Sequence, residues 1–112
     1  MLHLSDPSAP LVQIRVCRIE EIPPGMGRSF DIAGRSIAIF RTRAGTFHAT
    51  DNACPHAGAP LADGIIAGNC IVCPFHGRRF NLDSGQCDEQ SLTELTTYRT
   101  STDEDWIVVN LP

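Results

Sequence analysis

The sequence contains no lysine and no apolar run long enough to cross a bilayer. All nine basic residues of the 112 are arginine. There are 13 acidic residues, so the formal net charge is −4. An acidic chain is poorly suited to bind nucleic acid or an anionic membrane surface. A transmembrane helix needs about 18 or more consecutive apolar residues, and no such stretch occurs. We therefore expect neither nucleic acid nor a membrane among its partners.

Signals for export are also missing. Residues 1–7 have no basic segment followed by an apolar stretch, which a secretory signal requires. The chain has five cysteines, and an odd number in a protein that is not exported argues for metal binding or free thiols and against a disulfide framework. We expect a cytoplasmic protein.

The acidic residues are concentrated toward the C-terminus. From Asn81 onward the one basic residue, Arg99, faces seven acids: Asp83, Asp88, Glu89, Glu94, Asp103, Glu104 and Asp105. Such a bias suits docking to a basic protein surface. A solvated acidic face that aids solubility explains it equally well, because exposed charges contribute little to specific contacts.

Helical periodicity is absent, and short alternating segments separated by turn residues take its place. The segments expected as strands are 12–16, 29–32, 36–40, 46–50, 65–66, 70–72, 79–81, 96–99 and 106–109. Ala33-Gly34 predicts a hairpin turn, and Pro23-Pro24-Gly25 predicts a loop that includes Met26. The chain is therefore predicted to be all-β, a small antiparallel β-sandwich or barrel. We expect a loose tail over residues 1–10 and a single domain over 11–112.

Two short cysteine–histidine pairs are the most informative feature. They are Cys54-Pro55-His56 and Cys73-Pro74-Phe75-His76, with residues 57–72 between them. A proline follows each cysteine and a glycine follows soon after each histidine. Proline stiffens a loop, and glycine lets the backbone approach a bulky group. Two such loops can present two thiolates and two imidazoles to one point.

The mixed pairs distinguish between kinds of metal site. A structural zinc site usually groups its cysteines together and its histidines together. Such a site would make the chain a zinc-stabilised binding module. A mixed-ligand [2Fe–2S] cluster binds one iron through two cysteines and the other through two histidines. We therefore expect Cys54 and Cys73 on a buried iron and His56 and His76 on an outer iron. Neutral imidazole replaces anionic thiolate, so adding an electron costs less than in an all-cysteine cluster.

At these residues the chain resembles the Rieske [2Fe–2S] family. Residues 54–61 and 73–77 match its two cluster loops in order and spacing, and the likeness extends over nearly all of 12–112. The resemblance implies a Rieske-type fold, with antiparallel β-sheets and a small cluster-binding subdomain at one tip. It also implies that the two histidine edges approach solvent, where electrons leave.

The sequence departs from the respiratory-complex members of this family. Those members have an extra, disulfide-forming cysteine in each loop, and the matching positions here are Ala59 and Phe75. Their serine and tyrosine hydroxyls, which donate to the cluster sulfurs, correspond to Arg78 and Phe80. The chain therefore resembles the ferredoxin branch. Arg78 and Arg79 are candidates for tuning the cluster field or guiding an acidic partner, and a plain surface role is equally open.

The resemblance implies a one-electron carrier. In one branch the carrier passes electrons from a flavin reductase to a terminal oxygenase. In the other it is the small subunit of NAD(P)H-dependent nitrite reductase and docks on the large subunit. Segments 21–25, 31–35 and 38–40 are similar to both branches. The sequence offers no nucleophile–base pair and no phosphate loop, so we expect an electron-transfer component rather than an enzyme.

The remaining notable residues have structural interpretations. Cys17 is expected in the core, and Cys70 and Cys87 are expected to pack as small apolar groups. His48, on a predicted strand, is expected to be a hydrogen-bonded structural residue. Trp106 is expected to enter the core.

The missing hydroxyls predict a low reduction potential within the family. Fewer hydrogen bonds to the cluster sulfurs leave the reduced, more negative state less stable. We expect a midpoint in the lower part of the Rieske range of about −150 to +300 mV. A redox titration tests this, and a midpoint above about +200 mV, near the top of that range, contradicts it.

Overall fold

The computed structural model describes residues 12–56, 58–75, 77–87 and 94–112. The predicted tail over residues 1–10 and the predicted ligand His76 lie outside the described residues. Within those residues the elements are β1 (Val12–Arg18), η1 (Ile19–Glu21), β2 (Met26–Ile32), β3 (Arg35–Arg41), β4 (Phe47–Asp51), η2 (Leu61–Asp63), β5 (Ile65–Ala67), β6 (Cys70–Val72), β7 (Arg79–Asn81), β8 (Thr97–Asp103) and β9 (Trp106–Leu111), η marking a short 3₁₀ turn. This content confirms the all-β prediction. No helix among the described residues has the length and hydropathy of a membrane span.

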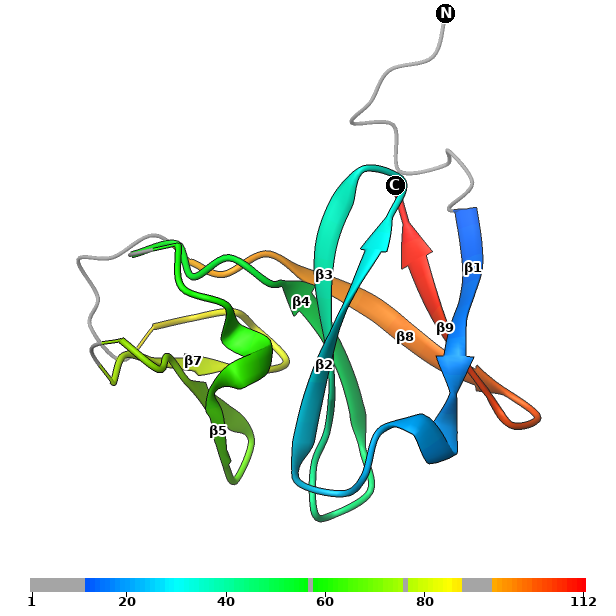
Figure 1. Cartoon of the computed structure of the whole chain (residues 1–112), viewed down its shortest axis with the longest axis horizontal. Helices are drawn as coiled ribbons and strands as arrows, with labels where there is room; N and C mark the ends of the chain where they lie inside the picture. The colour runs from blue at the N-terminus through cyan, green and yellow to red at the C-terminus, as the bar shows by residue number, and fades with distance from the viewer. Residues whose placement is uncertain (1–11, 57, 76, 88–93) are drawn as a thin grey trace, which may run out of the picture.

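The strands form two antiparallel sheets. The larger has the order β1-β9-β8-β4-β3-β2, and the smaller has the order β5-β6-β7. The small sheet lies to one side of the large one, beyond β2 and β3 (Figure 1). The predicted hairpin turn joins β2 to β3, with φ of 51° at Ala33 and 79° at Gly34, as a primed hairpin turn requires.

Strand β3 is buried on both faces and joins the two halves of the molecule. Ile37 and Ile39 pack into a core enclosed by the large sheet. The alternate residues Ala38 and Phe40 pack into a second core between β3 and the small sheet. Side chains alternate along a strand, so a continuous apolar run such as 37–40 is typical of a strand covered on both sides. The small sheet is therefore anchored on β3.

Asn52 fixes the segment that carries the chain from the large sheet to the small one. Its backbone carbonyl accepts a hydrogen bond from the Leu61 N–H at 2.7 Å. Its side-chain Oδ1 accepts one from the Ala62 N–H at 3.0 Å. The intervening segment, which contains the first predicted metal loop, is thus closed at its base.

Two sequence predictions are wrong. Met26 was expected in a loop, but it is the first residue of β2 and pairs with Arg41 of β3. Trp106 was expected in the core, but it is half-buried, with the guanidinium carbons of Arg15 and Arg18 at 5.9 and 4.8 Å from its ring centroid. The alternation of β9 turns Ile107 inward instead, and the two arginines cover the indole by cation–π contact.

Gly64, between η2 and β5, has no room for a side chain. A Cβ there would lie 2.2 Å from the Val72 carbonyl oxygen, directly before the second metal loop. We expect Gly64→Ala to cost about 3 kcal/mol of unfolding free energy, because backbone has to move.

Gly68→Ala is the matched control. Its backbone has a positive φ of 59°, but a Cβ meets nothing within 4 Å, so a loss of about 1 kcal/mol is expected. Urea unfolding of both variants measures the difference, and equal losses would contradict this account of Gly64.

Candidate metal centre

The two predicted metal loops are closed by the same backbone hydrogen bonds. In each, the cysteine N–H donates to the carbonyl five residues ahead, and a glycine N–H four residues ahead donates to the cysteine carbonyl. The bonds are Cys54 N to Ala59 O (2.9 Å), Gly58 N to Cys54 O (2.7 Å), Cys73 N to Arg78 O (2.8 Å) and Gly77 N to Cys73 O (3.1 Å). Gly58 and Gly77 have φ of 72° and 71°, a left-handed conformation that glycine adopts without strain. The loops therefore share one backbone design.

The shared closure makes positions in the two loops equivalent. Cys54 corresponds to Cys73, and Ala59 corresponds to Arg78. His56 corresponds to Phe75, because the second histidine stands one residue further from its cysteine.

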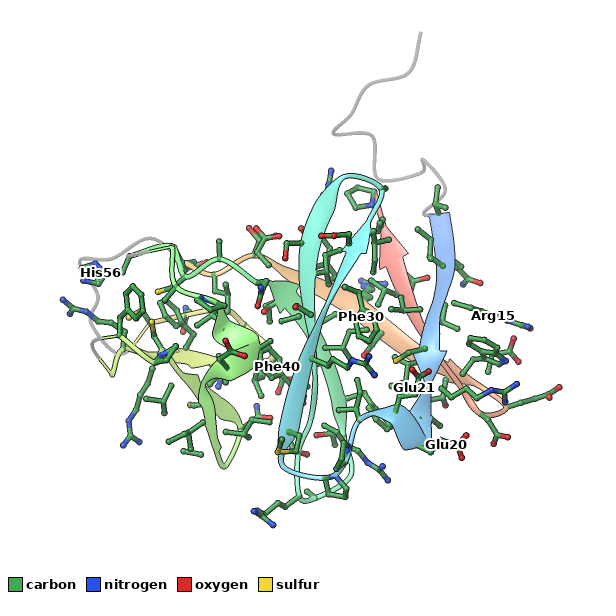
Figure 2. All side chains as sticks on the ribbon, viewed as in Figure 1. Arg15, Glu20, Glu21, Phe30, Phe40 and His56 are labelled. Atoms are coloured by element: carbon green, nitrogen blue, oxygen red, sulfur yellow. The ribbon has the colours of Figure 1, made fainter. Side chains whose placement is uncertain are left out.

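The described ligands differ sharply in exposure. Cys54 and Cys73 are each 2% exposed and belong to one core, the core that contains Phe80. His56 is exposed and lies at the end of the molecule farthest from β1 (Figure 2). The arrangement offers thiols from inside and an imidazole from the solvent side, as a cluster with one buried and one outer iron requires.

Cys54, His56 and Cys73 do not converge on a single point. No group of three or more His, Cys, Asp or Glu side chains within the described part of the chain is close enough to hold one metal ion. A mononuclear zinc site draws all its ligands to one atom. A dinuclear cluster separates its cysteine ligands from its histidine ligands, and two buried thiols with an exposed imidazole fit that division.

Arg78 joins the two loops. Its Nη2 lies 3.3 Å from Nε2 of His56. A guanidinium has only donors, so Nε2 is the acceptor in this contact. Sequence reasoning singled out Arg78 by its place after Gly77, but it did not predict this contact.

Ala59, Phe75 and Phe80 stand at positions where the resemblance implies disulfide cysteines or a hydroxyl, and they differ in burial. Phe80 is fully buried and Ala59 is 1% exposed, so both lie within the core. Phe75, in contrast, is 63% exposed at the outer loop. The core thus has an apolar side chain, Phe80, at the position that the resemblance matches to a hydroxyl of the respiratory-complex members.

His48 is a structural residue, as predicted, and it links the two sheets. From β4, its Nε2 lies 3.0 Å from the Thr46 hydroxyl, and its Nδ1 lies 3.3 Å from Oδ1 of Asp83, which follows β7. Burial lowers the pKa of His48, and the charge of Asp83 opposes this in part. A neutral imidazole satisfies both contacts, donating to the carboxylate and accepting from the hydroxyl.

The cysteines outside the loops are not metal ligands in this arrangement. Cys17 is 2% exposed, which confirms its place in the core. Burial and the nearby charge of Glu21 raise its pKa to about 11, against a smaller lowering effect of Arg28. Cys87 packs against the core between the sheets. Cys70 in β6 is only half-buried.

A family model described as the Rieske [2Fe-2S] domain matches residues 12–99. Among curated proteins, cholesterol 7-desaturase nvd of Xenopus laevis is 42% identical over 67 residues, which make up 59% of this chain and 15% of the desaturase. This chain spans 13–18% of the length of the curated relatives it matches.

Two solved structures match over almost their whole length. One is a candidate small subunit of NADH-dependent nitrite reductase from Mycobacterium tuberculosis, with a TM-score of 0.84, 27% identity and coverage of 91% of this chain and 96% of that one. The other is the ferredoxin of carbazole 1,9a-dioxygenase from Nocardioides aromaticivorans IC177, with a TM-score of 0.81, 26% identity and coverage of 89% and 98%.

The lowered pKa of His48 predicts a pH-dependent stability. In the unfolded chain His48 titrates near its ordinary pKa of 6.5, whereas the folded chain resists its protonation. Below pH of about 6.5 the unfolded state therefore binds more protons, and the free energy of unfolding falls as the pH falls.

Urea unfolding across this pH window measures the effect. We expect His48→Gln to be less stable than the wild type at neutral pH but to lose less stability on acidification. A variant whose stability falls as steeply as that of the wild type would show that His48 is not the group responsible.

Proposed function

This chain belongs to the Rieske [2Fe–2S] domain family, and we propose that it is a ferredoxin-type carrier of single electrons. The observation that carries the proposal is the pair of loops with one backbone design, which puts two thiols in a shared core and an imidazole at the exposed tip. A [2Fe–2S] cluster held by these loops would supply one-electron redox chemistry.

We assign the inner iron to Cys54 and Cys73 and the outer iron to His56 and His76. Buried thiolates are stable only when paired with a cation, and an iron ion provides that charge. The cysteine N–H and C=O groups are occupied within their loops, so the backbone holds each thiol in a fixed place. His56 provides a short route from the cluster to a docked partner, because its ring is exposed at the tip.

The proposed partners are a flavin reductase as donor and a terminal oxygenase as acceptor. The Nocardioides ferredoxin, which belongs to a dioxygenase system, supports this proposal, since this chain covers 98% of its length. In this role the chain passes electrons and does not transform a substrate, so it is a component of an oxidoreductase system.

A second candidate is the small subunit of a nitrite reductase. The Mycobacterium tuberculosis protein favours it, with its TM-score of 0.84. The two roles differ in how the chain is held: a ferredoxin dissociates between turnovers, whereas a subunit stays bound. Purification of the chain from its native cells distinguishes them, and a stable complex with a large catalytic chain supports the subunit role.

We also propose that residues 11–112 act as one unit in the cytoplasm. Both cores share β3, which supports a single unit. Cys17, Cys70 and Cys87 form no disulfide in the structure, which suits a reducing compartment.

The ligand assignment predicts the behaviour of the histidine variants. Purified wild-type protein should be brown, contain iron and bleach on reduction with dithionite. His56→Ala and His76→Ala should each lose the Rieske absorption and electron paramagnetic resonance spectra, because the outer iron loses a bond and is open to hydrolysis.

His48→Gln is the control, because the polar partners of His48 among the described residues are Thr46 and Asp83, which lie outside the predicted loops. It should keep the wild-type spectrum. A colourless, iron-free wild-type protein refutes the cluster, and a full Rieske spectrum in either alanine variant refutes the assignment of that ligand.

A further inference from the structure

Arg78 is the closing residue of the second loop. Its carbonyl accepts the hydrogen bond of the Cys73 N–H at 2.8 Å, so its backbone is fixed relative to a predicted ligand. The equivalent residue of the first loop is Ala59, which is buried and carries no charge. The two loops share a backbone design, but only the second places an ionised side chain at this position.

The side chain of Arg78 extends from the second loop to the first. Its Nη2 lies 3.3 Å from Nε2 of His56, and the residue is half-buried. A guanidinium keeps its charge at every pH at which proteins fold. A permanent positive charge is therefore held against the ring of a predicted iron ligand.

A charge in this place affects the two redox states unequally. Reduction adds one negative charge to the cluster and changes nothing on Arg78. Coulomb attraction between the cation and the added electron stabilises the reduced state relative to the oxidised state, which raises the midpoint potential. Arg78 and Phe80 stand where relatives have hydroxyls that also favour reduction, so the charge of Arg78 compensates in part for the missing hydrogen bonds.

Some of the acids lie away from His56 or are already paired. Glu20 and Glu21 lie in the other half of the molecule from His56 (Figure 2), in a molecule 41 Å long. Salt screens exposed charges beyond about 8 Å at physiological ionic strength. Nearer the loops, Asp83 is engaged by His48 and by the side-chain amide of Asn69, at 2.8 Å. The charge of Arg78, in contrast, lies directly against His56.

We propose that Arg78 is a positioning residue that holds a fixed positive charge against His56 and thereby raises the reduction potential of the cluster. The inference rests on the proposed function, because it needs the cluster between the two loops. Arg78 is not one of the proposed ligands. The inference gives Arg78 a larger effect on the potential than the neighbouring Arg79. Arg79 is exposed in β7, so its charge is open to screening by salt.

A redox titration of the intact chain tests the proposal, with the wild type, Arg78→Gln, Arg78→Lys and Arg79→Gln compared. The glutamine variant at position 78 should have a lower midpoint potential than the wild type, and the lysine variant should stay close to the wild type. Arg79→Gln should shift the potential less than Arg78→Gln. Raising the ionic strength should abolish the Arg79 shift and preserve most of the Arg78 shift. Iron content and the absorption spectrum report that the cluster is intact, and Arg78→Met, which keeps part of the aliphatic stem, is the second neutral variant.

Three results overturn the inference. An unchanged or higher potential in the neutral variants shows that the charge does not act on the cluster. An equal fall in the lysine variant shows that the shape of the guanidinium matters and its charge does not. Loss of iron from both neutral variants gives Arg78 a role in retaining the cluster instead of tuning it. A wild-type protein without a cluster contradicts the proposed function itself, whereas a normal cluster of unmoved potential contradicts this inference alone.

Discussion

The site depends on one pair of backbone hydrogen bonds that occurs twice. In each loop the cysteine N–H and C=O both form hydrogen bonds within the loop itself. The C=O accepts from the N–H of a glycine with positive φ. The direction of each thiol is thus set by the backbone rather than by long side chains. Two copies of this turn, facing one core, suffice to present Cys54 and Cys73 from the interior. In the first loop, His56 then falls on the solvent side, two positions after its cysteine.

The loops are held by a small sheet that packs on the large one. Its strands β5, β6 and β7 have three residues each, and they share a core with β3 through Phe40, Ile71 and Phe80. Asn52 and the pair of His48 and Asp83 add polar links between the same parts. The geometry of the site therefore depends on the apolar core that the small sheet shares with the large one.

Much of this could be predicted from the sequence, because the signals are local. Alternating segments and the Ala33-Gly34 turn predict the strands, and the mixed cysteine–histidine pairs predict the kind of cluster. The strand order was not predictable, since β1 lies next to β9 through pairs at opposite ends of the chain. Trp106 follows an apolar pattern, yet the arginines that cover it come from β1. The contact of Arg78 with His56 joins residues 22 positions apart, and neither residue alone predicts it.

The overall charge of the protein and the charge held against His56 differ in sign. Glu20 and Glu21 lie far from the tip, while an arginine contacts a predicted ligand there. The net charge of −4 thus does not describe the surroundings of the cluster.

The central claim is that histidine and cysteine share the cluster. Pulsed electron paramagnetic resonance of the reduced protein, labelled with ¹⁵N-histidine, tests it most directly. The account predicts strong hyperfine coupling from two histidine nitrogens, and a cluster signal without such coupling would contradict it.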